Sequence, residues 1–173
     1  MPDDPAAPRV TNREAGRVLV VDDDGALLLL RGRDPARPEA GSWWITPGGG
    51  LDEGETVQAA ARRELEEETG LVVVELGPVV FRRTVDFEFE GVHYRQREQF
   101  FCVRSPRFAI DDAGWTDVER RIFLEPRWWS YAELVATDEI IHPAELARIL
   151  RDVLARAGQD AIGGTGCGGG GPT

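Results

Sequence analysis

The alternation of apolar and polar residues along the chain predicts two hairpins. Arg17–Asp22 and Ala26–Arg31 are apolar runs of strand length, and the Asp23-Asp24-Gly25 turn between them favours an antiparallel connection. Val79–Glu90 and Val92–Val103 alternate apolar and polar residues on either side of a glycine, which predicts a second, longer hairpin. These four segments supply most of the expected sheet.

Two longer segments have helical patterns instead. Thr56–Thr69 contains no Gly or Pro, is rich in Ala, Glu, Arg and Leu, and ends at Gly70, a favourable C-terminal cap. Pro143–Ala157 places its apolar residues on one stripe and predicts an amphipathic helix. The pattern also predicts a short helix at Tyr131–Ala136 and short strands at Trp43–Thr46, Leu71–Leu76 and Arg127–Ser130. The expected fold class is therefore α/β, with a central mixed sheet packed between helices.

The two ends of the chain differ in composition from its middle. Residues 1–13 are polar and rich in Pro and Ala, which predicts a loose N-terminal arm, and the Gly-rich residues 158–173 predict a disordered tail. The single domain expected between them covers residues 14–157, and 173 residues are too few for two ordinary domains. No run approaches the roughly 20 apolar residues of a membrane span. The N-terminus also lacks the apolar core of a secretory signal, so we expect a cytoplasmic protein.

Charge and cysteine content narrow the function classes. The formal net charge of −11 disfavours binding to a nucleic-acid backbone, but a bound divalent cation could reverse the local sign for a small phosphorylated ligand. Cys102 and Cys167 have no metal-ligand spacing around them, which argues against a zinc site or a disulfide framework. We therefore interpret Cys102 as a small core residue.

The helix at 56–69 carries carboxylates on the side that should be apolar. On a helical wheel Glu64 and Glu68 fall within the apolar stripe and Glu67 falls at its edge, the stripe being defined by Val57, Ala60, Ala61 and Leu65. Like charges at this spacing repel one another, and desolvation adds to the cost when they are buried. A hard divalent cation such as Mg²⁺ or Mn²⁺ would offset both costs. The alternative is an ordinary solvated acidic face.

A glycine turn precedes this helix. Gly48, Gly49 and Gly50 allow a close approach of the backbone to a ligand, so that carbonyls could bind a metal and the amide of Gly49 could face phosphate oxygens. The alternative is that three glycines after a proline form only a turn.

The stretch from Gly49 to Leu71, GGLDEGETVQAAARRELEEETGL, resembles the Nudix box, Gx5Ex7REUxEExGU with U an aliphatic residue, and every fixed position matches. The resemblance implies a Nudix-type α/β/α sandwich. It also implies hydrolysis of a diphosphate linkage in a nucleoside derivative with Mg²⁺ or Mn²⁺. Glu64, Glu67 and Glu68 match the metal-binding positions, and Glu64 is in addition a candidate for activating water. Arg63 matches the residue that orients the box by pairing with a glutamate, here Glu55.

Residues outside the box complete the expected site. Glu98 is the candidate for the further base or metal ligand that many family members carry, and its alternative is an outward-facing strand residue. Arg31 could bind phosphate as an arginine fork or lie on the surface. Trp44 could stack on a base or anchor the core, and one of Trp43 and Trp44 should be in the core because neighbours in a strand point to opposite faces.

The resemblance does not fix the substrate. The extra signatures of the NADH, coenzyme A and ADP-ribose branches are missing, which leaves a small nucleotide, a nucleoside triphosphate or a modified nucleotide, as the expected substrate. Two other functions share the fold: an inactive nucleotide-binding regulator, and an isoprenoid-diphosphate isomerase, which would use a cysteine such as Cys102. The long hairpin could pair with a second copy, so a homodimer is an alternative to a monomer.

Overall fold

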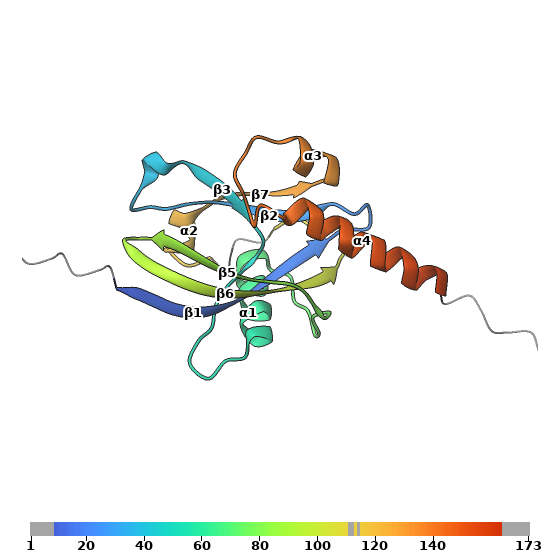
Figure 1. Cartoon of the computed structure of the whole chain (residues 1–173), viewed down its shortest axis with the longest axis horizontal. Coiled ribbons are helices and arrows are strands. Elements are labelled where there is room, and N and C mark those ends of the chain that lie inside the picture. The colour runs from blue at the N-terminus through green and yellow to red at the C-terminus, as the bar shows by residue number, and fades with distance from the viewer. Residues whose placement is uncertain (1–8, 111–112, 114, 164–173) are drawn as a thin grey trace, which may run out of the picture.

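The computed structural model describes residues 9–110, 113 and 115–163, which form a strongly curled sheet with helices on both faces (Figure 1). The eight strands run in the order β5-β6-β1-β2-β3-β8, with β4 pairing to β1 and β7 to β2. Their bounds are β1 Val10–Val21, β2 Leu27–Arg33, β3 Ser42–Ile45, β4 Gly48–Gly50, β5 Val79–Phe89, β6 Val92–Arg104, β7 Phe123–Trp129 and β8 Ile141–His142. The helices are η1 Pro38–Ala40, α1 Val57–Thr69, α2 Glu119–Ile122, α3 Tyr131–Ala136 and α4 Leu146–Gly163.

Strand β1 organises the sheet. It pairs in parallel with β6 along its whole length. Its other edge is shared, because Ala15, Gly16 and Arg17 pair with the glycine strand β4, whereas Val21 pairs with Leu27 of β2. The mixed sheet expected from the sequence is therefore confirmed, and one strand connects the glycine turn directly to the core.

Two apolar clusters lie on opposite faces of the sheet. One cluster packs the sheet against α4 and α3, and its members are Leu19, Val21, Leu27, Leu29, Trp44, Phe100, Trp129, Leu134, Leu146, Ile149, Leu150 and Val153. The other packs it against α1 and contains Val18, Val20, Leu28, Ala61, Leu65 and Phe101. The α/β/α layering is thus built from alternate residues of the same strands. No helix in the part of the chain described is long and apolar enough to cross a membrane.

The structure differs from the sequence-based expectation at two elements. Strand β1 begins at Val10, inside the range expected to be a loose arm, because β6 supplies backbone partners from His93 onward. Leu71–Leu76 was expected to be a strand, but no neighbouring strand pairs with it, and it is an irregular segment with a bend at Val74. Residues 1–8 and 164–173, where the rest of the arm and most of the tail were expected, lie outside the described residues.

Two further expected elements differ in length only, whereas the strands β4 and β8 and the short helices η1 and α2 were not expected from the sequence. β7 begins at Phe123 rather than Arg127 because it follows β2 as an antiparallel partner, and α4 continues beyond Ala157 to Gly163. The helix at 131–136 and the long hairpin have the expected positions.

Candidate active site

The orientation of α1 turns some of its carboxylates inward. The Thr56 side chain accepts a hydrogen bond from the amide of Ala59, and Gly70 ends the helix in the left-handed conformation, so the helix has the limits expected from its sequence. Glu68 is 3% exposed and lies on the same side as the buried Leu65, whereas Glu66 faces solvent. The inward placement of Glu68 is therefore an observed property of the fold.

Close packing of α1 against β1 depends on a residue without a side chain. A Cβ at Gly16 would lie 2.4 Å from the carbonyl oxygen of Val57 and 2.7 Å from the Cβ of Ala61. The helix therefore rests directly on the strand backbone, which brings its carboxylates to the glycine strand β4.

The glycine strand β4, which is the glycine turn of the sequence analysis, contacts two of these carboxylates. The amide of Gly48, a residue with φ of +132°, donates to an Oε of Glu68 over 2.8 Å. A Cβ at Gly49 would lie 2.5 Å from the carboxyl carbon of Glu64, so any side chain there would displace that carboxylate. Gly49 thus contributes space beside Glu64, and its contact with a substrate stays a prediction.

The Arg63 guanidinium donates hydrogen bonds to several groups of the candidate site. Its Nε and Nη2 donate to the two carboxylate oxygens of Glu55 over 3.1 and 3.0 Å. Its Nη1 donates to Glu64 over 2.7 Å and to Glu67 over 3.2 Å, and Nη2 also reaches the carbonyl of Gly50 over 3.0 Å. One guanidinium therefore fixes the box loop and two of the candidate ligands at the same time.

A carboxylate from outside the box joins this group. One oxygen each of Glu64, Glu67 and Glu119 lie within 4.8 Å of one another, a spacing that could hold a metal ion. Glu119 starts the short helix α2, where its carboxylate also accepts hydrogen bonds from the Thr116 amide and hydroxyl. The sequence around it indicates only a helix start, so sequence reasoning missed it. The nearby Trp115 donates its indole N–H to the carbonyl of Glu68 over 2.8 Å and holds this segment against α1.

The electrostatics of the carboxylates favour the binding of a positive charge. Burial raises the pKa of Glu68 well above its ordinary value, and the neighbouring Glu64 adds to the effect. Burial also raises the pKa of Glu64, although Arg63 opposes the shift. Carboxylate oxygens are the ligands that hard divalent cations prefer, so this donor set fits Mg²⁺ or Mn²⁺.

Glu98 is not an outward-facing strand residue, and its role as a further base or metal ligand stays a prediction. It is 2% exposed, which contradicts an outward-facing residue, and it is paired with Arg17 and Arg83 rather than grouped with the box carboxylates. Burial alone would raise its pKa, but Arg17 and Arg83 outweigh burial and hold the pKa below its ordinary value. Glu98 is therefore an ionised partner of arginines.

The other residues singled out from the sequence lie around the β2–β3 pair. Trp44 is 1% exposed and packs edge-on against Trp129 with ring centroids 5.1 Å apart, which places it in the core rather than on a surface open to a base. Arg31 donates to Glu125 over 2.9 Å and to Ser42 over 2.9 Å, and its side chain is 36% exposed. These two partners already occupy part of the hydrogen-bonding capacity of the Arg31 guanidinium. A phosphate-binding role for Arg31 stays a prediction.

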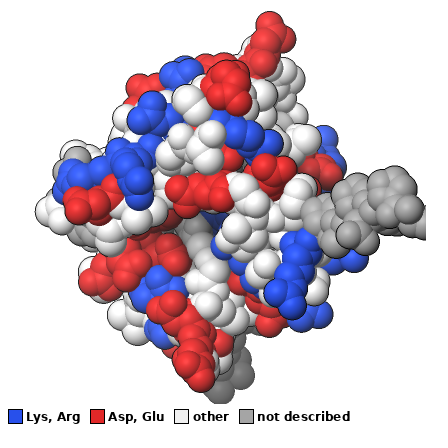
Figure 2. All heavy atoms as spheres, turned by 90° about the vertical axis from the view of Figure 1, so that its left-hand side faces the viewer, with Lys and Arg blue, Asp and Glu red and all other residues white. Residues whose placement is uncertain are grey.

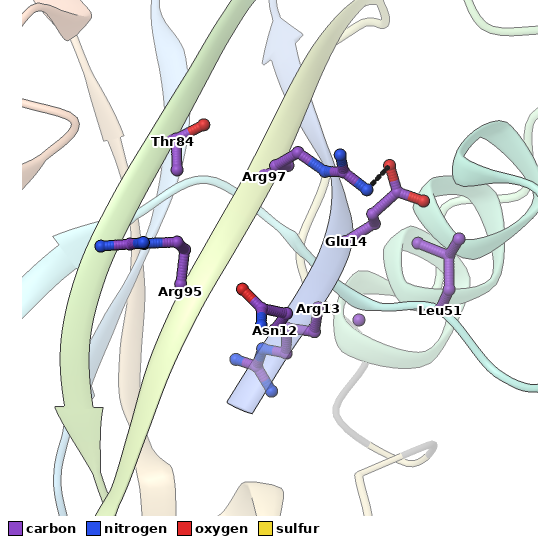
Figure 3. Close-up of a pocket in the computed structure, with 8 residues that line it drawn as sticks. Asn12, Arg13, Glu14, Leu51, Thr84, Arg95 and Arg97 are labelled. Atoms are coloured by element: carbon purple, nitrogen blue, oxygen red, sulfur yellow. Dashed lines mark ion pairs between the residues drawn. The ribbon is translucent and has the colours of Figure 1, made fainter. Parts of the chain in front are cut away.

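A polar pocket adjoins the box loop. It has a volume of about 800 Å³ and lies where β1, β5 and β6 extend beyond α1 (Figure 3). Arg97 reaches across it toward Glu14, with 3.4 Å between the charged groups. The residues that line it are Asn12, Arg13, Glu14, Gly50, Leu51, Thr84, Arg95 and Arg97. On the side of the molecule that Figure 2 shows, the surface is hollowed near the centre of the view, with acidic side chains along the rim.

Cys102 is a core thiol. It packs against the apolar cluster beneath α4, and burial raises its pKa to about 11 despite the opposing effect of Arg104. A thiol with that pKa stays protonated near neutral pH and is a poor nucleophile.

Comparison with known proteins gives a consistent result. The NUDIX domain profile matches residues 11–153, which is most of the chain. An RNA pyrophosphohydrolase of Caulobacter vibrioides is 35% identical over 135 residues, covering 73% of this chain and 74% of the relative. The nucleoside triphosphatase NudI of Escherichia coli is 39% identical over 125 residues, covering 71% of this chain and 82% of the relative.

Solved structures share the fold. A MutT protein from Methanosarcina mazei superimposes with a TM-score of 0.62 at 20% identity, covering 87% of this chain and 99% of that one. A MutT NUDIX hydrolase from Burkholderia pseudomallei gives a TM-score of 0.57 at 25% identity, covering 83% and 98%.

Proposed function

The chain belongs to the Nudix family, and on that premise we propose that its reaction takes place at the carboxylates of α1 with Mg²⁺ or Mn²⁺ as cofactor. Family membership assigns the metal-dependent hydrolysis of a diphosphate linkage in a nucleoside diphosphate derivative or a nucleoside triphosphate. The proposed location of the reaction rests on one observation. Carboxylate oxygens of Glu64, Glu67 and Glu119 lie within 4.8 Å of one another, beside the buried Glu68.

The proposed ligands are Glu64, Glu67 and Glu68 of the box together with Glu119 of α2. A bound divalent cation would neutralise charge on the diphosphate and make a hydroxide available near neutral pH. The raised pKa of Glu68 supports this assignment, because a buried carboxylate with a carboxylate neighbour is stabilised by a nearby positive charge.

Glu64 is proposed to hold the attacking water and to accept its proton. Arg63 fixes the orientation of Glu64 through the 2.7 Å hydrogen bond from Nη1, and the carboxylate is then in place to accept a proton from a water beside the metal. Water oxygen would then form a bond to phosphorus while the bridging P–O bond breaks and the leaving phosphate departs. Glu55 acts on this step only by holding Arg63.

A nucleoside triphosphate is the proposed substrate. The E. coli relative is named a nucleoside triphosphatase, and the net charge of −11 disfavours a long polyanion such as RNA. The two other functions considered from the sequence have less support. A regulator without activity would be expected to lose box carboxylates, and all are present, whereas an isomerase would need a reactive cysteine and Cys102 is a half-buried thiol with a raised pKa.

The test is a substrate panel with the full chain and either Mg²⁺ or Mn²⁺. Nucleoside triphosphates, ADP-ribose, a dinucleoside polyphosphate and 5′-triphosphorylated RNA would be compared by release of phosphate and pyrophosphate. We expect the highest kcat/KM with a nucleoside triphosphate and no turnover with a chelator. Glu64→Gln should lower kcat by at least about 10²-fold, while Glu66→Gln, on the exposed side of α1, should not.

Two results would overturn the proposal in different ways. Preference for triphosphorylated RNA would reject the substrate class, and full activity of Glu64→Gln would reject the location of the reaction.

A further inference from the structure

A cluster of arginines lies on the face of the sheet opposite α1. Arg17 lies two residues before Leu19 in β1, and Glu98 lies two residues before Phe100 in β6, so each shares a sheet face with a member of the apolar cluster that packs against α4. Arg83 of β5 is paired with Glu98 in the sheet register. The cluster therefore lies on the other face of the sheet from α1, although Arg17 is close enough to Glu64 and Glu68 to oppose the rise in their pKa.

One buried carboxylate and one buried amide anchor three guanidinium groups. Arg17 donates through Nε to Glu98 over 3.1 Å, and Arg83 donates through Nε to the other oxygen of Glu98. Arg13 donates through Nε to the side-chain oxygen of Gln96, whose amide nitrogen donates to Glu98 over 2.7 Å. Gln96 and Glu98 are 1% and 2% exposed, so both anchors are fixed within the fold.

The anchors use the Nε atoms and leave most terminal nitrogens available. Within the described part of the chain, no protein acceptor lies in hydrogen-bond range of the Nη atoms of Arg13 or Arg83. The side chains of Arg17 and Arg83 are only 14% and 21% exposed. Guanidinium donors that meet no protein acceptor must be satisfied by water or by an anion, and an anion gives the stronger, charge-assisted hydrogen bond.

The charge balance of the cluster is opposite to that of the protein. Three arginines surround one carboxylate, which leaves two positive charges in a chain whose net charge is −11. The Tyr94 ring packs 4.1 Å from the Arg13 guanidinium carbon and limits its movement.

The cluster also touches the glycine turn. Arg17 donates through Nη1 to the carbonyl of Gly48, the residue whose amide binds Glu68. An anion held by the cluster would therefore lie close to the diphosphate that the box carboxylates are proposed to process.

We propose that Arg13, Arg17 and Arg83 form a phosphate subsite, held in place by Glu98 and Gln96, which binds a substrate phosphate other than those at the α1 carboxylates. In this arrangement Glu98 is a positioning residue. The subsite favours substrates with three or more consecutive phosphates over those with two. It rests on the proposed function, because the phosphate concerned belongs to that substrate.

The subsite can be tested without the metal centre. Calorimetry with inorganic tripolyphosphate and the full chain in excess chelator measures anion binding while the carboxylates are without metal. Arg83→Gln should weaken binding about 10-fold, which is the effect expected for losing a charged hydrogen-bond donor. Arg82→Gln is the matched control, because Arg82 is the neighbouring residue of β5 and faces solvent on the opposite side of the sheet. It should change binding less than about 2-fold.

Kinetics with Mg²⁺ provide the second measurement. Arg83→Gln should raise KM for a nucleoside triphosphate about 10-fold with little change in kcat, and should leave KM for a nucleoside diphosphate derivative nearly unchanged. Equal tripolyphosphate affinity of the wild type and Arg83→Gln, or an equal loss in Arg82→Gln, would overturn the subsite. Such a result with normal turnover would leave the proposed reaction standing, whereas loss of turnover with intact anion binding would reject the reaction and not the subsite.

Discussion

The amide of Gly48 and the carboxylate of Glu68, twenty residues apart in the chain, meet at 2.8 Å and join the glycine turn to the last turn of α1. Together with the Arg63 hydrogen bonds to Gly50 and Glu55, this contact holds the loop against the helix that carries the proposed metal ligands. It also leaves Glu68 with a neutral donor in a buried position beside another carboxylate.

Glu68→Gln should separate activity from folding. A glutamine oxygen can still accept the Gly48 hydrogen bond, so the turn should keep its place, but one negative charge is lost from the proposed metal shell. We expect kcat to fall by at least about 10²-fold in the presence of Mg²⁺. Glu66→Gln is the control on the exposed side of the same helix, and a Glu68→Gln enzyme with wild-type turnover would remove Glu68 from the site.

The same residue should give the metal-free protein an unusual dependence of stability on pH. The folded-state pKa of Glu68 is raised above its ordinary value of 4.5, so the folded protein binds the proton more tightly than the unfolded chain. Its contribution to stability is therefore fully present below about pH 4.5 and is lost as the pH rises toward the folded-state pKa.

Thermal unfolding in chelator can isolate this contribution. Other carboxylates titrate in the same range, so the quantity to follow is the difference in Tm between Glu68→Gln and the wild type. We expect the variant to be the more stable at about pH 8 and this advantage to shrink toward about pH 5. An advantage that is independent of pH would contradict the shift, and added Mg²⁺ should raise the Tm of the wild type more than that of the variant.

Glu119→Gln tests the carboxylate that lies outside the box. If Glu119 is a ligand, the Mn²⁺ concentration needed for half-maximal activity should rise at least about 10-fold. Glu53→Gln removes an exposed carboxylate from the box loop without touching the cluster and should leave that concentration unchanged. If both variants needed the same Mn²⁺ concentration for half-maximal activity, Glu119 would not be a metal ligand and would serve only to start α2.

Gly49→Ala tests the space beside Glu64. The added methyl group would fall 2.5 Å from the Glu64 carboxyl, which is the end of a flexible side chain and can turn away. We therefore expect about a 10-fold loss of kcat with little change in Tm. Gly50→Ala is a close control, because its Cβ would meet only the carbonyl oxygen of Glu14 at 3.8 Å, and activity should be retained there.

Parts of this site follow from the sequence because they depend on one helix. The wheel position of Glu68 predicts its burial, since the side on which a helical residue lies is fixed by its spacing from Leu65. The pairing of Arg63 with Glu55 also follows from the box resemblance and is present in the structure. Secondary structure was predictable where the local pattern and the tertiary environment agree, as in the β5–β6 hairpin.

Other parts depend on contacts between distant segments and have no local signal. Glu119 reaches Glu64 because the segment that begins α2 is tied to α1 through the Trp115 hydrogen bond to Glu68, and a Thr-x-x-Glu pattern indicates no more than a helix start. Glu98 was placed correctly within a strand, but its arginine partners come from β1 and β5 and could not be identified without the sheet register. Residues Val10–Arg13 form strand only because β6 offers partners.

The divided edge of β1 suggests how proteins of this architecture can diversify. Ala15–Arg17 of β1 pair with the glycine strand β4, and Val21 pairs with the core strand β2. The position of the proposed hydrolytic centre is therefore set by a strand that is itself held in the protein interior. The tip of the β5–β6 hairpin and the segment that holds η1 are not part of that pairing. Substitutions at those two places therefore leave the pairing of β1 with β4 and β2 unchanged.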